Sequence, residues 1–310
     1  MTEIVLERGA SPRPKRRHRA RRRKGPGVAF VLPAAVFVTV FGIYPLVELV
    51  RMSASTVGFA NILDNRWPFV GFDNFSTLFD SPTFSEALTN TLIFVTLVVS
   101  ISVVGGMAAA LALRAATLPR RLTLALLVFV WTLPPVVSGS VWRFLFSSEG
   151  VVNEAISRTH IHEPVFWLSD PSLSLYSVAF VNAWAALPFA ALVLRAGLMG
   201  IPPQTLEAAA VDGASGWRTF WYVTLPQLRP VILVLIVLIT VYAFRSFDFI
   251  FIMTLGGPGT SSTTLPYLAY QEAFTLGFFD LGAAVAVIAG LFVAVTAAFY
   301  VRLTRREAHA

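Results

Sequence analysis

Long apolar stretches dominate the chain, and its charged residues gather in short clusters between them. A segment of about 20 largely apolar residues is long enough to cross the hydrocarbon core of a bilayer. Six stretches reach this length, at residues 28–50, 88–113, 122–146, 173–199, 230–253 and 281–303. Only 13% of the residues are charged, against about 25% in a soluble domain. The sequence therefore predicts an all-α integral membrane protein with six transmembrane helices, and it excludes a soluble domain.

The basic residues predict the orientation of these helices in the membrane. Of the 24 Lys and Arg residues, ten lie in residues 1–27, three in 114–121, three in 195–229 and three after residue 301. These four segments fall on the same side of a six-span layout, and basic residues favour the cytoplasmic side. We therefore expect a basic cytoplasmic tail (1–27), a membrane domain (28–303) and a cytoplasmic C-terminal tail (304–310). No aromatic or folded context accompanies the basic tail, so nucleic acid is not an expected partner.

Several kinds of chemistry are excluded by what the sequence lacks. No lysine follows Lys24, so a phosphate-binding loop that ends in Gly-Lys-Ser/Thr is impossible in the membrane domain. Cysteine is absent, and no nucleophile and base stand in a recognisable arrangement. His160 and His162 beside Glu163 resemble a metal site, but one short loop without further ligands is better explained as solvated. We expect neither an enzyme nor a metal-binding protein.

The connection between the fourth and fifth spans, residues 200–229, is the longest one on the cytoplasmic side. Pro203 suits the first turn of a helix, where its missing N–H is not needed. Gly213 is a typical helix stop, and Ser215 can cap a second short helix that must end near Pro226. The sequence predicts a helix–turn–helix that lies on the cytoplasmic face.

The spacing of residues in this loop resembles the EAA loop of permeases in binding-protein-dependent ABC importers. The pattern runs as Glu207-Ala208-Ala209, three residues, Gly213, nine residues, Val223, one residue, and Leu225-Pro226. The family commonly has isoleucine where this chain has Val223. The segment from Glu207 through Asp212 to Ala214 is similar to the carbohydrate-uptake branch of the family. Three further segments are similar to that branch: Trp142-Arg-Phe-Leu-Phe146, Gly150-Val-Val-Asn153, and Gly256-Gly-Pro258.

The resemblance implies the type I permease fold of ABC importers, with the loop as a coupling helix that docks on an ATP-binding subunit. Glu207 would make the polar contact to that subunit, with Ala208 and Ala209 in its groove. Gly213 would supply the turn, and Leu225-Pro226 would end the element before the fifth span. The residues assigned to coupling are Glu207, Ala208, Ala209, Asp212, Gly213, Leu225 and Pro226.

The same resemblance implies a complex in a bacterial cell membrane. Its other members would be a second homologous permease, two ATP-binding subunits and an extracytoplasmic solute-binding protein. ATP and Mg would be bound by the ATP-binding subunits, so no cofactor is expected in this chain. The solute would be a sugar or a sugar derivative.

Polar and aromatic residues within the spans suggest where such a solute passes, because polar groups inside a membrane are costly. At 100° per residue, Tyr242, Arg245, Ser246 and Phe249 share one face of a continuous helix. The expected path residues are Phe189, Tyr242 and Ser246, with Asn182 as a weaker candidate. The alternative is that the aromatic residues only pack, and that Arg245 and Asp248 neutralise each other. Prolines 134, 135 and 188 are expected to be kinks rather than hinges.

Two other classes of protein remain to be weighed against an importer subunit. An autonomous ion-coupled transporter or channel would use several carboxylates or histidines inside the membrane, and this chain offers few. An intramembrane enzyme would need a catalytic constellation, which the sequence lacks. Neither the solute nor the permease that holds it follows from the sequence.

Overall fold

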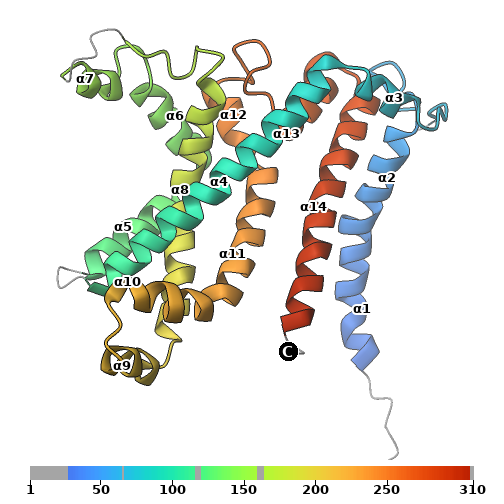
Figure 1. Ribbon diagram of the computed structural model, residues 1–310. Helices are drawn as coiled ribbons and strands as arrows, with labels where there is room; N and C mark the ends of the chain where they lie inside the picture. Colours follow the sequence, from blue (N-terminus) through green and yellow to red (C-terminus); the bar gives the residue numbers. More distant parts are fainter. Residues whose placement is uncertain (1–26, 65, 116–119, 159–163, 308–310) are drawn as a thin grey trace, which may run out of the picture. The chain divides into compact units, whose positions relative to one another are not determined.

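The structure is a computed structural model that describes residues 27–64, 66–115, 120–158 and 164–307, and the described chain is largely helical (Figure 1). Contacts divide it into two compact units, Met1–Val47 and Glu48–Ala310, which are described separately. The predicted tail at 1–27, except Gly27, and the loop with His160, His162 and Glu163 lie outside the described residues.

The described part of the first unit is one continuous helical path. It comprises α1 (Gly27–Val38), the π-helical segment η1 (Thr39–Ile43) and the start of α2 (Tyr44–Ser53). Pro45 has no N–H to continue the regular ladder, and the turn before it is wider, with the Tyr44 N–H bonded to the Thr39 carbonyl. A π turn beside a proline keeps the helix going, as is common where the ladder is interrupted. This path agrees with the first predicted span.

Five helices among the described residues are long and apolar enough to cross a membrane, and one bent pair raises the number to six. Besides the first path, the long helices are α4 (Pro82–Ala115), α8 (Ser174–Met199), α11 (Leu225–Phe244) and α14 (Phe279–Glu307). The six predicted spans are therefore all represented. α14 extends into the segment predicted as the C-terminal tail.

The third predicted span is not one helix. α5 (Arg120–Thr132) and α6 (Pro135–Leu145) meet at an angle of 98°. Pro134 sits between them in an extended conformation, with ψ 139°, because a residue that precedes a proline is pushed out of the helical region. Pro135 then starts α6. The Pro134–Pro135 pair thus makes a sharp break, and the prediction of a mere kink was wrong.

The fifth predicted span, 230–253, was also wrong as a single helix. α11 begins earlier, at Leu225, and ends at Phe244; α12 (Asp248–Met253) follows after a break. At the break the Arg245 N–H bonds the carbonyls of both Val241 and Tyr242, and the ladder tightens before it stops. Asn182 on α8 donates a hydrogen bond to Ser246 Oγ and ties this break to the neighbouring helix.

The core of the second unit lies where α4 packs closely on α8. A Cβ atom on Gly106 would lie 2.6 Å from the Ala190 Cβ and 3.0 Å from the Ala191 backbone nitrogen. Ser102 Oγ donates a hydrogen bond of 3.2 Å to the Ala183 carbonyl across the same contact. Small residues and interhelical hydrogen bonds of this kind allow helices to associate within a membrane.

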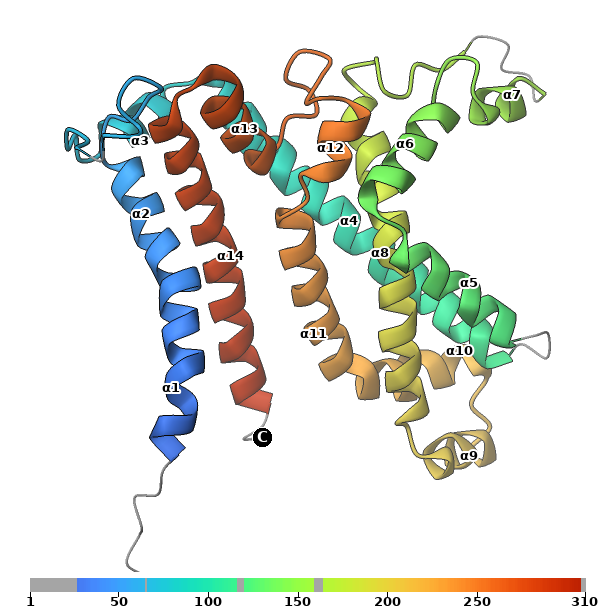
Figure 2. The ribbon, with the colours of Figure 1, turned by 180° about the vertical axis from the view of Figure 1, so that it is seen from behind.

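Short elements lie at both ends of this second unit. Figure 2 shows α9 (Pro203–Val211) and α10 (Gly216–Thr219) at one end; α3 (Asp73–Phe79), α6, α7 (Val151–Ser157) and α13 (Leu265–Tyr270) lie toward the other. The π-helical segments η2 (Phe220–Thr224) and η3 (Gln271–Leu276) follow α10 and α13 respectively.

Buried amide and carboxylate side chains hold the loops at the α7 end. Asn74 donates to the carbonyls of Ser53 and Ser55. Asn90 does the same for Thr260 and Thr263, and Asp280 accepts a hydrogen bond from the Val57 N–H at 3.0 Å. Because each side chain satisfies backbone groups of a loop, these loops have fixed positions without regular secondary structure.

Candidate coupling helix and solute cavity

The predicted start and end of α9 agree with the structure. Pro203 occupies the first turn, and Gly213 follows the helix with φ +76°. The Ala214 N–H bonds the Ala209 carbonyl at 3.0 Å, and the Gly213 N–H bonds the Ala210 carbonyl at 3.1 Å. This pair of hydrogen bonds is a Schellman motif, which needs a left-handed residue at the position of Gly213.

The second helix also starts as predicted but ends elsewhere. Ser215 Oγ accepts a hydrogen bond of 3.4 Å from the Arg218 N–H and caps α10. The helical path then continues through η2 into α11, where the Leu225 N–H bonds the Phe220 carbonyl. The expectation that Leu225-Pro226 ends the element was therefore wrong, because the wider π turn accommodates Pro226 without a break.

α9 exposes one face that no part of the described chain covers. Its members are Gln204, Glu207, Ala208 and Val211, which stand at the i, i+3, i+4 and i+7 positions of a helix. We call them the α9 face. Asp212, just beyond the helix, is also exposed.

One residue of the predicted coupling set points the other way. Ala209 is only 9% exposed, and α9 packs against α10 and η2 of its own chain. The expectation that Ala209 enters a partner's groove is thus corrected: it anchors α9. Val211 was missed, although it is 87% exposed and its spacing of four from Glu207 places it on the same face.

A cavity of about 370 Å³ lies at the break between α5 and α6. We call it the bend cavity, and four helices besides α6 contribute to it. Its lining residues are Val130, Trp131, Leu133, Pro135, Ala185, Ala186, Phe189, Leu238, Ile239, Tyr242 and Phe249.

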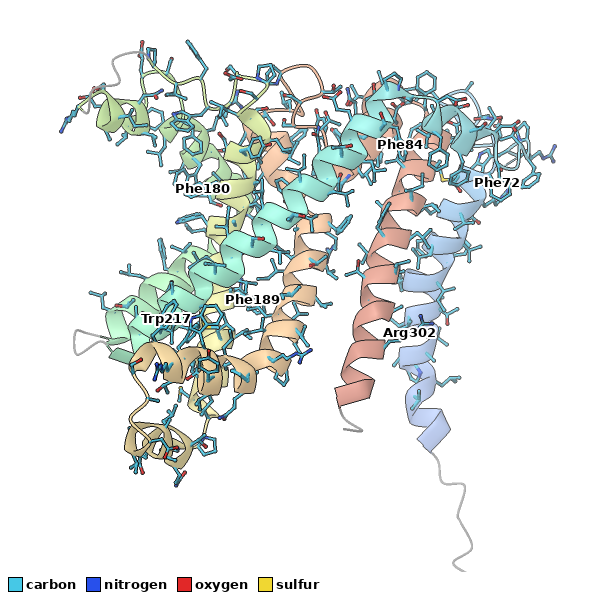
Figure 3. The ribbon with its side chains drawn as sticks, in the orientation of Figure 1. Phe72, Phe84, Phe180, Phe189, Trp217 and Arg302 are labelled. Atoms are coloured by element: carbon cyan, nitrogen blue, oxygen red, sulfur yellow. The ribbon has the colours of Figure 1, made fainter. Side chains whose placement is uncertain are left out.

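Aromatic rings are the main recognition groups in the bend cavity. Phe189 comes from α8 (Figure 3) and stacks on Trp131 with ring centroids 5.7 Å apart. Tyr242 is 41% exposed at the end of α11. Trp131 was absent from the predicted path residues, because a continuous third helix gave no reason to turn it toward Phe189. Apolar rings with one hydroxyl suit a ligand that has apolar faces and polar edges.

The other two predicted path residues lie outside this lining. Asn182 is fully buried and Ser246 is 8% exposed, and they bond to each other. Asn182 Oδ1 has no hydrogen-bond partner among the described residues. Since α11 ends at Phe244, Tyr242 and Ser246 do not share a continuous helix face: Tyr242 is exposed while Ser246 is covered.

The alternative that Arg245 and Asp248 neutralise each other does not agree with the structure. The ion pairs among the described residues are Arg51–Glu48 and Arg158–Glu154, and the side chains of Arg245 and Asp248 are both exposed. The break between α11 and α12 separates two residues that a continuous helix would have placed one turn apart.

Comparison with known proteins identifies relatives over nearly the whole chain. The "Sulfoquinovosyl glycerol transport system permease protein SmoG" of Agrobacterium fabrum is 34% identical over 286 residues, which cover 90% of each chain. The "Trehalose/maltose transport system permease protein MalF" of Thermococcus litoralis is 30% identical, covering 90% of this chain and 93% of the relative.

A solved structure supports the same fold. A chain in the crystal structure of a bacterial ABC transporter involved in the import of the acidic polysaccharide alginate superposes with a TM-score of 0.77. It is 24% identical, and the match covers 90% of this chain and 94% of that one. The predicted type I permease fold is confirmed. Residues 86–309 match the family described as "Binding-protein-dependent transport system inner membrane component", and the chain belongs to that family.

Proposed function

We propose that the chain forms one half of the solute path in an ATP-driven importer of a sugar or sugar derivative. The observation that carries the proposal is the α9 face, where Glu207, Ala208 and Val211 are exposed on a helix closed by a Schellman motif. A rigid helix with an unpartnered face is suited to transmit the movement of another protein. Through the continuous path of α10, η2 and α11, such a push would reach Tyr242 at the bend cavity.

The proposed occupant of the α9 face is an ATP-binding subunit. Glu207 supplies a charge for its rim, and Ala208 and Val211 supply a small and an apolar surface for its groove. Asp212 and Gly213 complete the turn beside this contact. Two such subunits would bind ATP and Mg, so the chain itself would be neither an enzyme nor a cofactor-binding protein.

The positive-inside distribution supports an orientation with α9 and both termini in the cytoplasm. The α7 end then faces outward, toward a solute-binding protein. A second, homologous permease would complete the path across the bilayer. ATP binding would turn the path outward, and hydrolysis would reset it inward.

The proposed solute is a saccharide, which the bend cavity would hold between its aromatic rings. Two relatives whose names specify sugar-containing substrates are 34% and 30% identical to this chain over 90% of its length. A sugar ring has apolar C–H faces that stack on rings such as Trp131 and Phe189, and hydroxyl groups that the Tyr242 hydroxyl can meet.

The coupling half of the proposal is tested by purifying the tagged chain from its native membrane. Wild type, Glu207→Lys and the control Gln227→Lys are compared at matched expression; Gln227 is exposed and lies in α11, outside α9. We expect wild type and Gln227→Lys to retain an ATP-binding subunit and ATPase activity, and Glu207→Lys to lose both. A wild-type chain that purifies alone and inactive in mild detergent would instead favour an autonomous transporter.

The solute half is tested by uptake. Trp131→Ala and Tyr242→Ala should each lower uptake at least tenfold while ATPase assembly persists, because each removes a wall of the bend cavity. Ser246→Ala should have a smaller effect, since Ser246 supports the helix break rather than the lining. Full uptake by a well-expressed Trp131→Ala, Tyr242→Ala double variant would rule out the bend cavity as the path.

A further inference from the structure

A second cavity has a volume of about 520 Å³ and lies beside α6 and α12, which Figure 1 shows toward the end of the unit opposite α9. It is bounded by the end of α6, by residues 166–169 and by the turn that follows α12. We call it the loop cavity. The lining residues that matter below are Arg143, Ser148, Phe166, Trp167, Ser169 and Thr254.

The walls of the loop cavity are held in place before any ligand arrives. Asn153 is 6% exposed; its Oδ1 accepts hydrogen bonds of 3.1 Å from the Val165 N–H and from Trp167 Nε1. Its Nδ2 lies 3.1 Å from the Ser147 carbonyl and 3.0 Å from the Val165 carbonyl. The Trp167 ring stacks on Phe146 at 5.6 Å. A site of this kind loses little conformational entropy when it binds.

The wall of the loop cavity that the turn after α12 forms is also held by hydrogen bonds. Ser262 Oγ lies 2.8 Å from both the Gly257 carbonyl oxygen and Thr254 Oγ1, and its single O–H can donate to either. Arg143 reaches across from α6, and its Nη1 donates a hydrogen bond of 3.1 Å to the Ile252 carbonyl. This bond orients the guanidinium group, and arginine carries five N–H donors, so the group can also meet a ligand.

The described lining of the loop cavity carries charge of one sign, which is positive. Among the described residues that line it, Arg143 alone has an ionisable side chain. Glu149 and Asp170 adjoin the lining in sequence but are not part of it. The Asp170 carboxylate is engaged elsewhere: it accepts hydrogen bonds from the Ser172 Oγ and N–H, and these bonds lower the pKa of Asp170.

These features together select a ligand class. A planar, oriented guanidinium group binds a carboxylate or a similar oxyanion in bidentate fashion. The Phe166 ring is 57% exposed, and it can cover the apolar face of a sugar ring, while the hydroxyls of Ser148 and Ser169 can meet sugar hydroxyls. The volume lies within the range of small-ligand sites.

We propose that the loop cavity is a separate subsite for a saccharide that carries a carboxylate or another anionic group, and that Arg143 selects for that group. This inference rests on the proposed importer function and deepens it by naming the substrate class. The subsite would receive the solute at the outer face before it reaches the bend cavity.

The test measures binding to the full-length chain in nanodiscs, alone and within its complex, by titration calorimetry at low ionic strength. The probes are digalacturonate, which carries carboxylates, and cellobiose, a neutral disaccharide. Wild type should bind digalacturonate at least tenfold more tightly than cellobiose, and added salt should narrow that ratio. Arg143→Gln should remove the difference, and Arg143→Lys should keep part of it because the charge remains.

Three outcomes would overturn the subsite. Equal affinity of wild type for digalacturonate and cellobiose would contradict the proposed selection of an anionic sugar. Arg143→Gln could instead weaken the binding of both sugars equally and lower the unfolding temperature. The role of Arg143 would then be limited to its hydrogen bond with the Ile252 carbonyl. If Arg143→Gln weakens stimulation by a solute-binding protein without any dependence on sugar, the loop cavity is a protein contact.

Failure of the subsite can be told apart from failure of the importer proposal. Co-purification of the ATP-binding subunit, and its loss in Glu207→Lys, do not depend on Arg143. A chain that retains this assembly but shows no anionic preference contradicts only the subsite.

Discussion

Two segments of the chain resemble the same family, yet the structure uses them in opposite ways. Gly150-Val-Val-Asn153 lies at the α7 end, where Asn153 is buried and bonds two segments of backbone. A Cβ atom on Gly150 would lie 2.3 Å from the Leu145 carbonyl oxygen, so the chain itself requires glycine there. The segment from Glu207 to Gly213 lies at the α9 end, where Glu207 and Val211 are exposed.

The contrast shows that a family pattern does not reveal by itself what its residues contact. The first segment satisfies the hydrogen bonds and close contacts of its own loop, as buried polar groups must. The second segment leaves a helix face exposed, and an exposed face does not stabilise the isolated chain. Burial separates a pattern that maintains the fold from a pattern that fits a partner.

The largest expected effect comes from charging the α9 face. Val211→Arg should weaken association with the ATP-binding subunit at least tenfold, because a charge would enter an apolar contact. Its unfolding temperature should match that of wild type, since Val211 is 87% exposed. Pull-down at graded concentrations and thermal unfolding measure the two effects, with Gln227→Arg as the control. A large loss of stability in Val211→Arg would show that the α9 face, like the α7 end, maintains the fold of the chain itself.

At the α7 end we expect the opposite: a large effect on stability and no effect on association with the ATP-binding subunit. Asn153→Ala removes the hydrogen-bond partner of Trp167 Nε1 and of the Val165 N–H and carbonyl, at a cost of about 1–3 kcal/mol. Thermal unfolding should show this loss, while the ATP-binding subunit should still co-purify. Gln204→Ala removes an exposed amide and should leave the unfolding temperature unchanged. Equal unfolding temperatures for the two variants would contradict the role of Asn153.

A smaller effect is expected from two glycines that flank the turn after α9. An added Cβ meets no atom within 4 Å at either Gly213 or Gly216, but only Gly213 has a positive φ, at +76°. Gly213→Ala should cost about 1 kcal/mol because the left-handed region is unfavourable for alanine. Gly216→Ala, at the first position of α10, should be neutral or slightly stabilising. Hydrogen exchange of α9 compares them, and faster exchange in Gly216→Ala than in Gly213→Ala would refute the Schellman assignment.

The smallest effect is a pH dependence at the α7 end. Burial, and to a lesser degree the nearby Asp280 carboxylate, raise the pKa of Glu272 in η3 above its usual value. A raised pKa in the folded state favours the protonated form, so this contribution to stability is complete below the ordinary glutamate pKa and is lost as the pH rises through the raised value.

Glu272→Gln should remove this dependence and be more stable than wild type at neutral pH. Unfolding temperatures of both proteins across the acidic range measure the difference. A difference that grows as the pH falls would show the wrong sign and contradict the role of burial.

Much of the architecture could be predicted from the sequence because it depends on local or repetitive properties. Apolar length located the six spans, Pro203 and Gly213 marked the start and end of α9, and Ser215 marked the start of α10, since a helix terminus depends on the few residues beside it. The spacing around Glu207 identified the family for the same reason.

The errors arose where distant residues decide the outcome. The break before Ser246 is tied down by Asn182, which is 64 residues away, and the pairing of Trp131 with Phe189 requires α5 to lie against α8. No helical periodicity within one span contains that information. Proline signals alone could not separate the sharp bend at Pro134 from the continuous path through Pro226, because the surrounding helix can widen into a π turn.

The sequence by itself determined that the chain spans a membrane through about six apolar segments, and which family its loop at 200–229 resembles, because hydropathy and short spacings are local. Only the tertiary structure decided that Ala209 turns inward while Val211 turns outward, and that Asn182 and Ser246 support a break. It also decided that Arg143 has the one ionisable side chain among the described residues that line the loop cavity. The physical reason is that burial and charge isolation are properties of what surrounds a residue, and those surroundings come from helices far apart in the chain.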